Sequence, residues 1–261
     1  MRVAGVQMDI AWEDPPENFR RAAILAERAV AEGARLVVLP EMFATGFSMN
    51  AALVSGFAGD AKAFLSGLAS RLSAWVLGGY GEPGEPRPAN ACSIFDPAGE
   101  EVLHFRKLHL FTLSGEDRHY APGDSLATVD VEGVRITPLI CYDLRFPEPF
   151  RAAARRTDLF CVPANWPDKR ADAWSTLLRA RAMENQAYVL GVNRVGEVGG
   201  ELHSGHSALV DPMGKDVAVA ESGVAGILSG DVDAVEVARA RERFSALRDR
   251  RPDVYGRLED G

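Results

Sequence analysis

Cysteine is scarce in this sequence of 261 residues, and long hydrophobic runs are missing from it. The three cysteines, Cys92, Cys141 and Cys161, are odd in number and form no CxxC pair, which argues against a disulfide framework and indicates a reducing cytoplasm. No run reaches the roughly 18 apolar residues that a membrane span requires, and residues 1–16 lack the apolar stretch of a signal peptide. We therefore expect a cytoplasmic protein with no membrane segment.

Long basic tracts are also missing. The chain carries 29 Lys and Arg against 37 Asp and Glu, a net charge of −8. Because phosphate affinity depends on clustered basic side chains, this balance argues against a nucleic-acid binder. The remaining composition, 47% hydrophobic and 25% charged, is ordinary for a globular protein. Partners are expected to be small molecules or further copies of the chain.

What the sequence does contain is an alternation of strand and helix patterns. Residues 2–8 form an apolar run, an amphipathic helix is predicted over 17–32, a buried strand over 35–39 and a second helix near 60–72. This order predicts a largely parallel sheet. The turn residues Asp96-Pro97-Ala98-Gly99 separate two short runs and predict a hairpin that adds antiparallel strands.

The alternation resumes in the second half of the chain. Apolar runs and amphipathic stretches predict strands within 134–143, 158–166, 187–194, 206–215 and 223–233, and helices over 171–186 and 234–244. No low-complexity linker and no fixed-period repeat interrupts the pattern. We expect a single α/β domain over residues 1–261.

Several predicted strands end abruptly at a polar residue. Glu41, Lys107, Cys141 and Asn165 each follow an apolar run directly. In open α/β sheets, ligands bind at the carboxyl ends of strands. We therefore expect these four side chains to converge on one crevice.

Cys141 differs from the other two thiols in its position. It lies at a predicted strand-to-helix turn, where helix N–H groups and a nearby cation would favour a thiolate. Cys92 and Cys161 lie inside apolar runs, where burial raises the pKa of a thiol and makes it inert. A small buried hydrophobe is the alternative interpretation of Cys141.

The segments around these residues read LPEMFATGF at Glu41, FRKLHLF at Lys107 and LICYDLRFPE at Cys141. With them, and with ANWPDKRADAW and SGHSALVDPMGK further on, the sequence resembles the nitrilase superfamily of carbon–nitrogen hydrolases over nearly its whole length. Among the branches of that superfamily it is most similar to the omega-amidases, which hydrolyse the side-chain amide of 2-oxoglutaramate or 2-oxosuccinamate.

The resemblance implies a four-layer α-β-β-α sandwich with mixed sheets, and a homodimer or larger even assembly whose helix layers pack together. It implies that Cys141 is the nucleophile, Glu41 the general base and Lys107 the cation that stabilises the tetrahedral intermediate. Glu116, nine positions after the lysine, matches a second glutamate of the family. The implied substrates are a small amide and water, with no cofactor and no metal.

The expected substrate-binding residues surround the nucleophile in the sequence: Phe47, Tyr142, Arg145, Asn165 and Trp166. A carboxylate-bearing amide needs a cation at its far end, and Arg145, Arg170 and Arg194 lie near predicted strand ends. Arg145 pairing with the neighbouring Glu148 is an equal alternative. Phe43, like Phe47, either walls the pocket or belongs to the core.

Other functions leave weaker signals. Residues 79–84 match GxGxxG, but Pro83, Pro86 and Pro88 forbid the helix that this dinucleotide-binding fingerprint requires. A metal-dependent hydrolase using His203 and His206 with Glu201, on a predicted loop, is an alternative of another class. A Cys-His hydrolase and a nitrilase of different substrate range also stay open.

Overall fold

The computed structural model describes residues 1–259, with side chains up to residue 256. Its first six-stranded sheet has the order β14-β1-β2-β3-β4-β5. Strands β1, β2 and β3 are parallel, and the remaining pairs are antiparallel. The strands are β1 (Arg2–Gln7), β2 (Leu36–Val38), β3 (Trp75–Glu82), β4 (Ala89–Phe95), β5 (Glu101–Arg106) and β14 (Gly226–Asp231).

The second six-stranded sheet has the order β13-β12-β9-β8-β7-β6 and is also mixed, with β7, β8 and β9 parallel. The predicted parallel pairing is thus correct for only three adjacent strands of each sheet, and the predicted antiparallel hairpin is confirmed by the pairing of β4 with β5. A separate hairpin joins β10 (Val195–Val198) to β11 (Glu201–Ser204). The strands of the second sheet are β6 (Val129–Val131), β7 (Val134–Pro138), β8 (Leu159–Ala164), β9 (Tyr188–Asn193), β12 (Ala208–Val210) and β13 (Asp216–Val219).

Local sequence accounts for the first long helix. Asp14 caps it by accepting a hydrogen bond from the backbone N–H of Glu17, and Pro15 occupies its first turn. Gly33 follows its end with φ +95°, a conformation that glycine adopts at little cost. The helices are α1 (Pro15–Ala31), α2 (Ala51–Gly56), α3 (Ala58–Leu72), α4 (Glu116–His119), α5 (Pro147–Ala153), α6 (Ala171–Asn185), α7 (Ala234–Arg243) and α8 (Pro252–Glu259).

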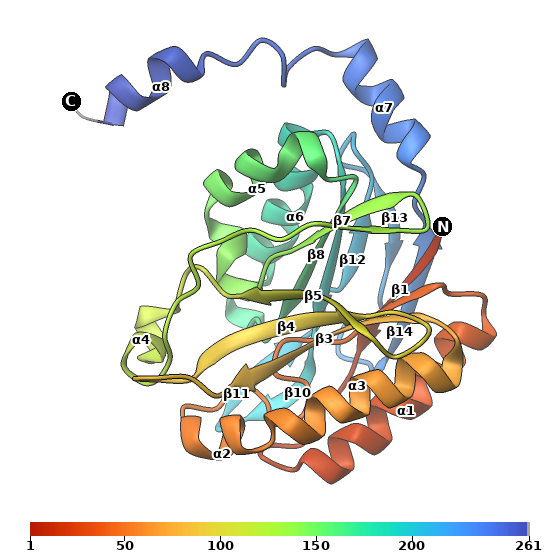
Figure 1. Ribbon diagram of the computed structural model, residues 1–261, viewed down its shortest axis with the longest axis vertical. Helices are drawn as coiled ribbons and strands as arrows, with labels where there is room; N and C mark the ends of the chain where they lie inside the picture. The colour runs from red at the N-terminus through yellow and green to blue at the C-terminus, as the bar shows by residue number, and fades with distance from the viewer. Residues whose placement is uncertain (260–261) are drawn as a thin grey trace.

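The predicted helices correspond to α1, α3, α6 and α7. Helices α2, α4 and α8 were not predicted, and α5 was implied only by the predicted strand-to-helix turn at Cys141. Helix α2 has only six residues, too few to show a helical period. Helix α8 lies in the polar C-terminal segment and stands apart from the two sheets in Figure 1. No helix in the described part of the chain is long and apolar enough to cross a membrane.

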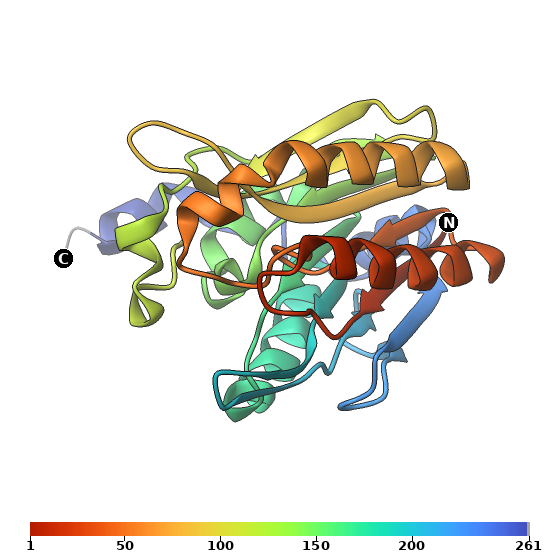
Figure 2. The ribbon, with the colours of Figure 1, turned by 90° about the horizontal axis from the view of Figure 1, so that it is seen from below.

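The two sheets face each other and carry helices on their outer sides, which confirms the four-layer α-β-β-α sandwich. Helices α1 and α3 lie side by side across the first sheet, and α5 and α6 cover the second (Figures 1 and 2). One apolar core lies between the sheets and continues under α5 and α6, while a second fills the space beneath α1 and α3. Burial of these two cores is the main term that stabilises the fold.

This arrangement brings four strand ends to one edge of the sandwich. Glu41 follows β2, Lys107 follows β5, Cys141 follows β7 and Asn165 follows β8. The GxGxxG stretch begins in the second half of β3, where Gly79 allows another backbone segment to approach closely. A Cβ atom on Gly79 would lie 2.9 Å from the Cα of Glu41.

Candidate active site

A buried ammonium group shared by two carboxylates lies at the centre of the site. Lys107 Nζ is 2.8 Å from Glu41 Oε1 and 2.9 Å from Glu116 Oε2, and all three side chains are fully buried. Burial alone would lower the pKa of Lys107, but the charges of Glu116 and Glu41 outweigh it and raise that pKa above its usual range. Lys107 is therefore a permanent cation here.

Asn90 completes this group and was missed by the sequence analysis. Its side-chain amide donates to Glu41 Oε1 at 2.7 Å and to Glu116 Oε1 at 2.9 Å, while the backbone N–H of Phe111 donates to Glu116 Oε2 at 2.6 Å. Burial is the largest influence on Glu116 and raises its pKa. The available signal was an amide side chain, Asn90, within the apolar run of β4, which also contains Ser93.

Cys141 begins a short 3-10 turn, Cys141–Arg145, with its backbone in the left-handed region at φ +46°. Burial, followed by the charge of Glu41, raises the pKa of its thiol; the charge of Lys107 and a backbone hydrogen bond from Asn165 lower it by less. The nearby cation thus favours the thiolate in the expected direction, but burial and the neighbouring carboxylate outweigh it and raise the pKa.

Asn165 connects this turn to Glu41. Its backbone N–H donates to Glu41 Oε2 at 2.9 Å, and its side-chain amide donates to the Glu41 carbonyl oxygen at 2.6 Å. Cys92 and Cys161 lie fully buried in β4 and β8, where burial raises the pKa of both thiols. Only Cys141 among the three thiols lines a cavity next to charged side chains.

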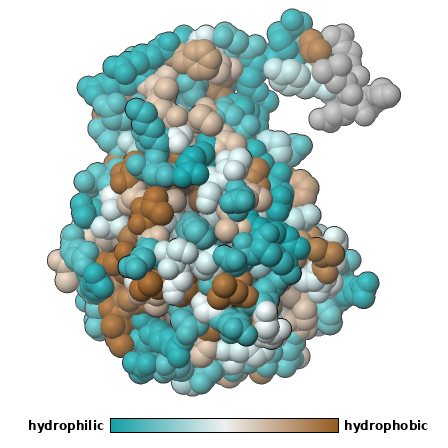
Figure 3. Space-filling view, turned by 180° about the vertical axis from the view of Figure 1, so that it is seen from behind, coloured by the Kyte–Doolittle hydropathy of each residue, from teal (hydrophilic) through white to brown (hydrophobic). Residues whose placement is uncertain are grey.

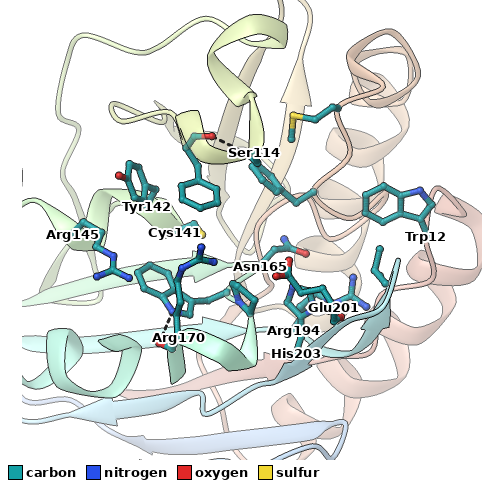
Figure 4. A pocket seen from close by; sticks show the side chains of 16 residues that line it. Trp12, Ser114, Cys141, Tyr142, Arg145, Asn165, Arg170, Arg194, Glu201 and His203 are labelled. Carbon is teal, nitrogen blue, oxygen red and sulfur yellow. Dashed lines mark hydrogen bonds between the residues drawn. The ribbon is translucent and has the colours of Figure 1, made fainter. Parts of the chain in front are cut away.

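A cavity of about 220 Å³ opens over Cys141. Trp12 lies at one end of it and Arg145 at the other (Figure 4). Phe43 belongs instead to the core beneath α1 and α3, where its ring packs against Phe19 and Phe64. The cavity is lined by every residue expected to bind substrate: Phe47, Tyr142, Arg145, Asn165 and Trp166.

The three candidate arginines all line this cavity but differ in their partners. Arg194 is buried and donates to the carbonyl oxygens of Ile10 and Val195, and burial lowers its pKa to about 10. Arg145 and Arg170 form no ion pair with any residue whose side chain the structure describes, so the alternative Arg145–Glu148 pair is not formed. Their guanidinium groups lie instead over the rings of Trp166 and Phe111, at 4.9 and 5.4 Å.

The histidines do not build a second centre. His203 lies in strand β11 rather than in the predicted loop, and burial lowers its pKa to about 4. In the described part of the chain, no three His, Cys, Asp or Glu side chains gather as metal ligands, so His203, His206 and Glu201 do not form a ligand set. The charged side chains that shift the pKa of Cys141 are Glu41 and Lys107, which leaves a Cys-His pair without support.

Comparison with known proteins agrees with this geometry. The chain is 36% identical to omega-amidase YafV of Escherichia coli K12 over 95% of this chain and 96% of that protein. It is 31% identical to 2-oxoglutaramate amidase of Bacillus subtilis 168 over 97% of this chain and 98% of that protein.

One solved structure shows a reacted cysteine on the same fold. It is a variant of the amidase from Nesterenkonia sp. AN1 that carries the result of a Michael addition of acrylamide at its active-site cysteine. It matches with a TM-score of 0.88 and 28% identity over 99% of each chain. The model of the carbon-nitrogen hydrolase family matches residues 2–242. The chain therefore belongs to the carbon–nitrogen hydrolase family of the nitrilase superfamily and is a hydrolase of carbon–nitrogen bonds other than peptide bonds.

Proposed function

We propose that the protein is a thiol-dependent amidase that splits a small, carboxylate-bearing amide into acid and ammonia. The observation that carries this proposal is the buried Glu41–Lys107–Glu116 group beside Cys141, whose side chain lines the cavity. An amide carbon is a poor electrophile, and a cysteinyl thioester divides its hydrolysis into two easier steps.

In the first step, Cys141 Sγ bonds to the amide carbon while Glu41 accepts the thiol proton. Burial and the charge of Glu41 favour the neutral thiol, so this transfer occurs as the sulfur attacks. The carbon–nitrogen bond then breaks, and the proton on Glu41 goes to the departing ammonia. In the second step, Glu41 accepts a proton from water, the resulting hydroxide attacks the thioester, and the thiolate leaves and regains the proton.

Both steps pass through a tetrahedral oxyanion. Lys107, a fixed cation, and the backbone N–H of Tyr142 are proposed to stabilise it, and Glu116 holds Lys107 in place. Loss of one such donor typically costs roughly a hundred- to a thousandfold in turnover.

The substrate class follows from the charge in the cavity. Arg145 and Arg170 line the cavity with Cys141 and form no ion pair with any described side chain, so one substrate carboxylate would form a charge-assisted hydrogen bond there. The similarity to an omega-amidase and to a 2-oxoglutaramate amidase supports the same class. We propose 2-oxoglutaramate and similar dicarboxylate monoamides as substrates.

The test compares an anionic amide with a neutral one of similar length. We expect kcat/KM for 2-oxoglutaramate or succinamate to exceed that for butyramide by at least about tenfold, some 1.4 kcal/mol. Arg145→Gln and Arg170→Gln, made singly, should reduce this preference and spare butyramide. Equal turnover of neutral amides or of nitriles would refute the substrate class and favour a nitrilase or another amidase.

We further propose that the protein works in the cytoplasm as a single-domain homodimer. The free thiols Cys92 and Cys161 in the core support a reducing compartment. Cell fractionation with an antibody to the protein tests the location, and recovery in an oxidising compartment would contradict it.

A further inference from the structure

Two segments that carry the proposed catalytic groups meet outside the cavity. The first, residues 107–116, begins at Lys107 and ends at Glu116; the second, residues 140–146, contains Cys141. They are joined where His109 contacts Asp143. His109 Nδ1 lies 2.8 Å from Asp143 Oδ1, and the backbone N–H of His109 donates to the same oxygen at 2.8 Å.

Asp143 is fully buried and also shapes the turn that carries the nucleophile. Its Oδ2 accepts the backbone N–H of Ile140 at 2.9 Å, while its own N–H donates to the Ile140 carbonyl oxygen at 2.9 Å. Cys141 lies between these two residues at φ +46°, a conformation that costs energy for a residue with a side chain. Such a conformation persists only where its surroundings fix it, and Asp143 supplies that constraint.

Aromatic contacts reinforce the connection. The His109 ring stacks on Phe146 at 3.8 Å with an interplanar angle of 10°, and Phe146 meets Tyr142 edge-on at 5.2 Å. Tyr142 in turn contacts Phe111 at 4.9 Å. The first segment therefore touches the second through both His109 and Phe111. Phe111 and Tyr142 line the cavity, whereas His109 does not; it lies about one-third exposed in a shallow depression on the outside.

We propose that His109 is a positioning residue of this amidase: its bond to Asp143 holds the Cys141 turn in register with Glu41 and Lys107. The inference rests on the proposed function for its kinetic consequence. His109 touches neither the cavity nor the reacting atoms, so its effect is on the geometry of the nucleophile. A misplacement of about 1 Å at a reacting centre can cost on the order of a hundredfold in rate.

Three substitutions separate the hydrogen bond from the stacking. His109→Phe keeps a ring against Phe146 but has no donor. His109→Asn loses the ring, yet its amide nitrogen is as many bonds from Cα as Nδ1 and can still donate to Asp143. In His109→Gln the amide nitrogen lies one bond further from Cα than Nδ1 does, as Nε2 does in histidine. It is therefore not positioned to replace Nδ1 against Asp143. His119→Phe changes an exposed histidine of α4, outside the cavity, and serves as the matched control.

We expect His109→Phe and His109→Gln to lower kcat for 2-oxoglutaramate roughly 10- to 100-fold with little change in KM. His109→Asn should recover most of kcat, and His119→Phe should equal the wild type. A merely structural role for His109 would lower the melting temperature and leave kcat per folded molecule unchanged. That result, or equal impairment of the Phe and Asn variants, would overturn the proposal.

Hydrogen–deuterium exchange over residues 139–146 measures how firmly the Cys141 turn is held, and it needs no substrate. We expect faster exchange in His109→Phe than in His109→Asn, with no change in strand β8 (Leu159–Ala164) of either variant. Wild-type exchange in His109→Phe would contradict the positioning role even if the amidase proposal held. If exchange is faster in His109→Phe but the wild-type protein hydrolyses no amide, the proposed function is refuted. The role of His109 in holding the turn would still stand.

Asp143→Asn tests the other end of the bond. In either orientation of the new amide, its NH2 group must face an N–H donor, that of Ile140 or that of His109. We expect a larger loss of kcat than in His109→Phe. If this variant does not fold, the His109 series still decides the proposal.

Discussion

At the scale of single residues, the buried charged groups beside Cys141 determine how its thiol reacts. Two carboxyl groups, those of Glu41 and Glu116, share the single ammonium group of Lys107 within a fully buried volume. Burial, followed by the negative charge of Glu41, disfavours a resting thiolate at Cys141 and raises the pKa of its thiol. Transfer of the proton from Cys141 to Glu41 leaves the total charge of the site unchanged. The thiolate therefore forms without adding a further charge to the buried group.

Substitution of the three cysteines tests this chemistry. Cys141→Ala and Cys141→Ser should abolish ammonia release, because no other group can form the thioester. Cys92→Ala and Cys161→Ala should keep wild-type kcat and lose about 1–2 kcal/mol of unfolding free energy from the core. Ammonia assays and urea denaturation measure the two effects. Substantial activity in either Cys141 variant would refute the mechanism.

At the scale of elements, strand β3 helps to position Glu41, because the Glu41 backbone packs closely against Gly79 of that strand. A Cβ on Gly79 would lie 2.9 Å from both Glu41 Cα and Met42 N, closer than real Cβ atoms come. We expect Gly79→Ala to displace the Glu41 segment, destabilise the fold by about 1–3 kcal/mol and lower kcat roughly 10- to 100-fold. Steady-state kinetics and thermal denaturation measure both.

Gly67→Ala is the matched control for this substitution. Gly67 lies in helix α3, and a Cβ there meets nothing within 4 Å. Alanine should raise the unfolding free energy by about 0.5–1 kcal/mol and leave kcat unchanged. Unaltered kcat in Gly79→Ala would show that Glu41 tolerates the displacement.

Strand β11 contributes a pH-dependent term to stability through His203. Burial lowers the pKa of His203 to about 4, against an ordinary value of 6.5. Between these values the unfolded chain binds a proton that the folded chain excludes, so stability falls as the pH decreases from 6.5 to 4. Above pH 6.5 this term is absent.

We expect the wild type to lose about 1–3 kcal/mol more unfolding free energy than His203→Gln between pH 7 and pH 4.5. Urea denaturation at the two pH values measures the difference. Parallel losses in the two proteins would show that His203 accepts a proton in the folded state.

At the scale of the whole molecule, the open question is assembly. Met183 on α6 is 52% exposed and Met213 is 64% exposed, and the Met183 side chain lies against Gly214. The face in Figure 3 likewise carries apolar patches among hydrophilic side chains. Exposed apolar surface of this kind is suited to burial against a second copy.

We expect a homodimer or larger even assembly in multi-angle light scattering. Met183→Glu with Met213→Glu should weaken that assembly, because a charge in an apolar interface is costly to bury. A fully active monomer at all concentrations would contradict the expected assembly.

The sequence by itself determined the features that depend on local pattern. Helices α1, α3, α6 and α7 follow from apolar periodicity and capping residues, and the hairpin at Asp96–Gly99 follows from its turn residues. Glu41, Lys107 and Cys141 were found at strand ends for the same reason, with roles taken from a family resemblance.

Only the tertiary structure decided what depends on neighbours distant in the sequence. It set the antiparallel pairing of β14 with β1 and of β9 with β12, because the direction of strands distant in the sequence is a long-range property. It placed Asn90 between two carboxylates and raised the pKa of Cys141. It also directed Arg194 to backbone carbonyl oxygens, while Arg145 and Arg170 form no ion pair with the side chains that the structure describes. A pKa, a free guanidinium or a close backbone approach is a property of the surroundings, and the surroundings of each of these residues come from other parts of the fold.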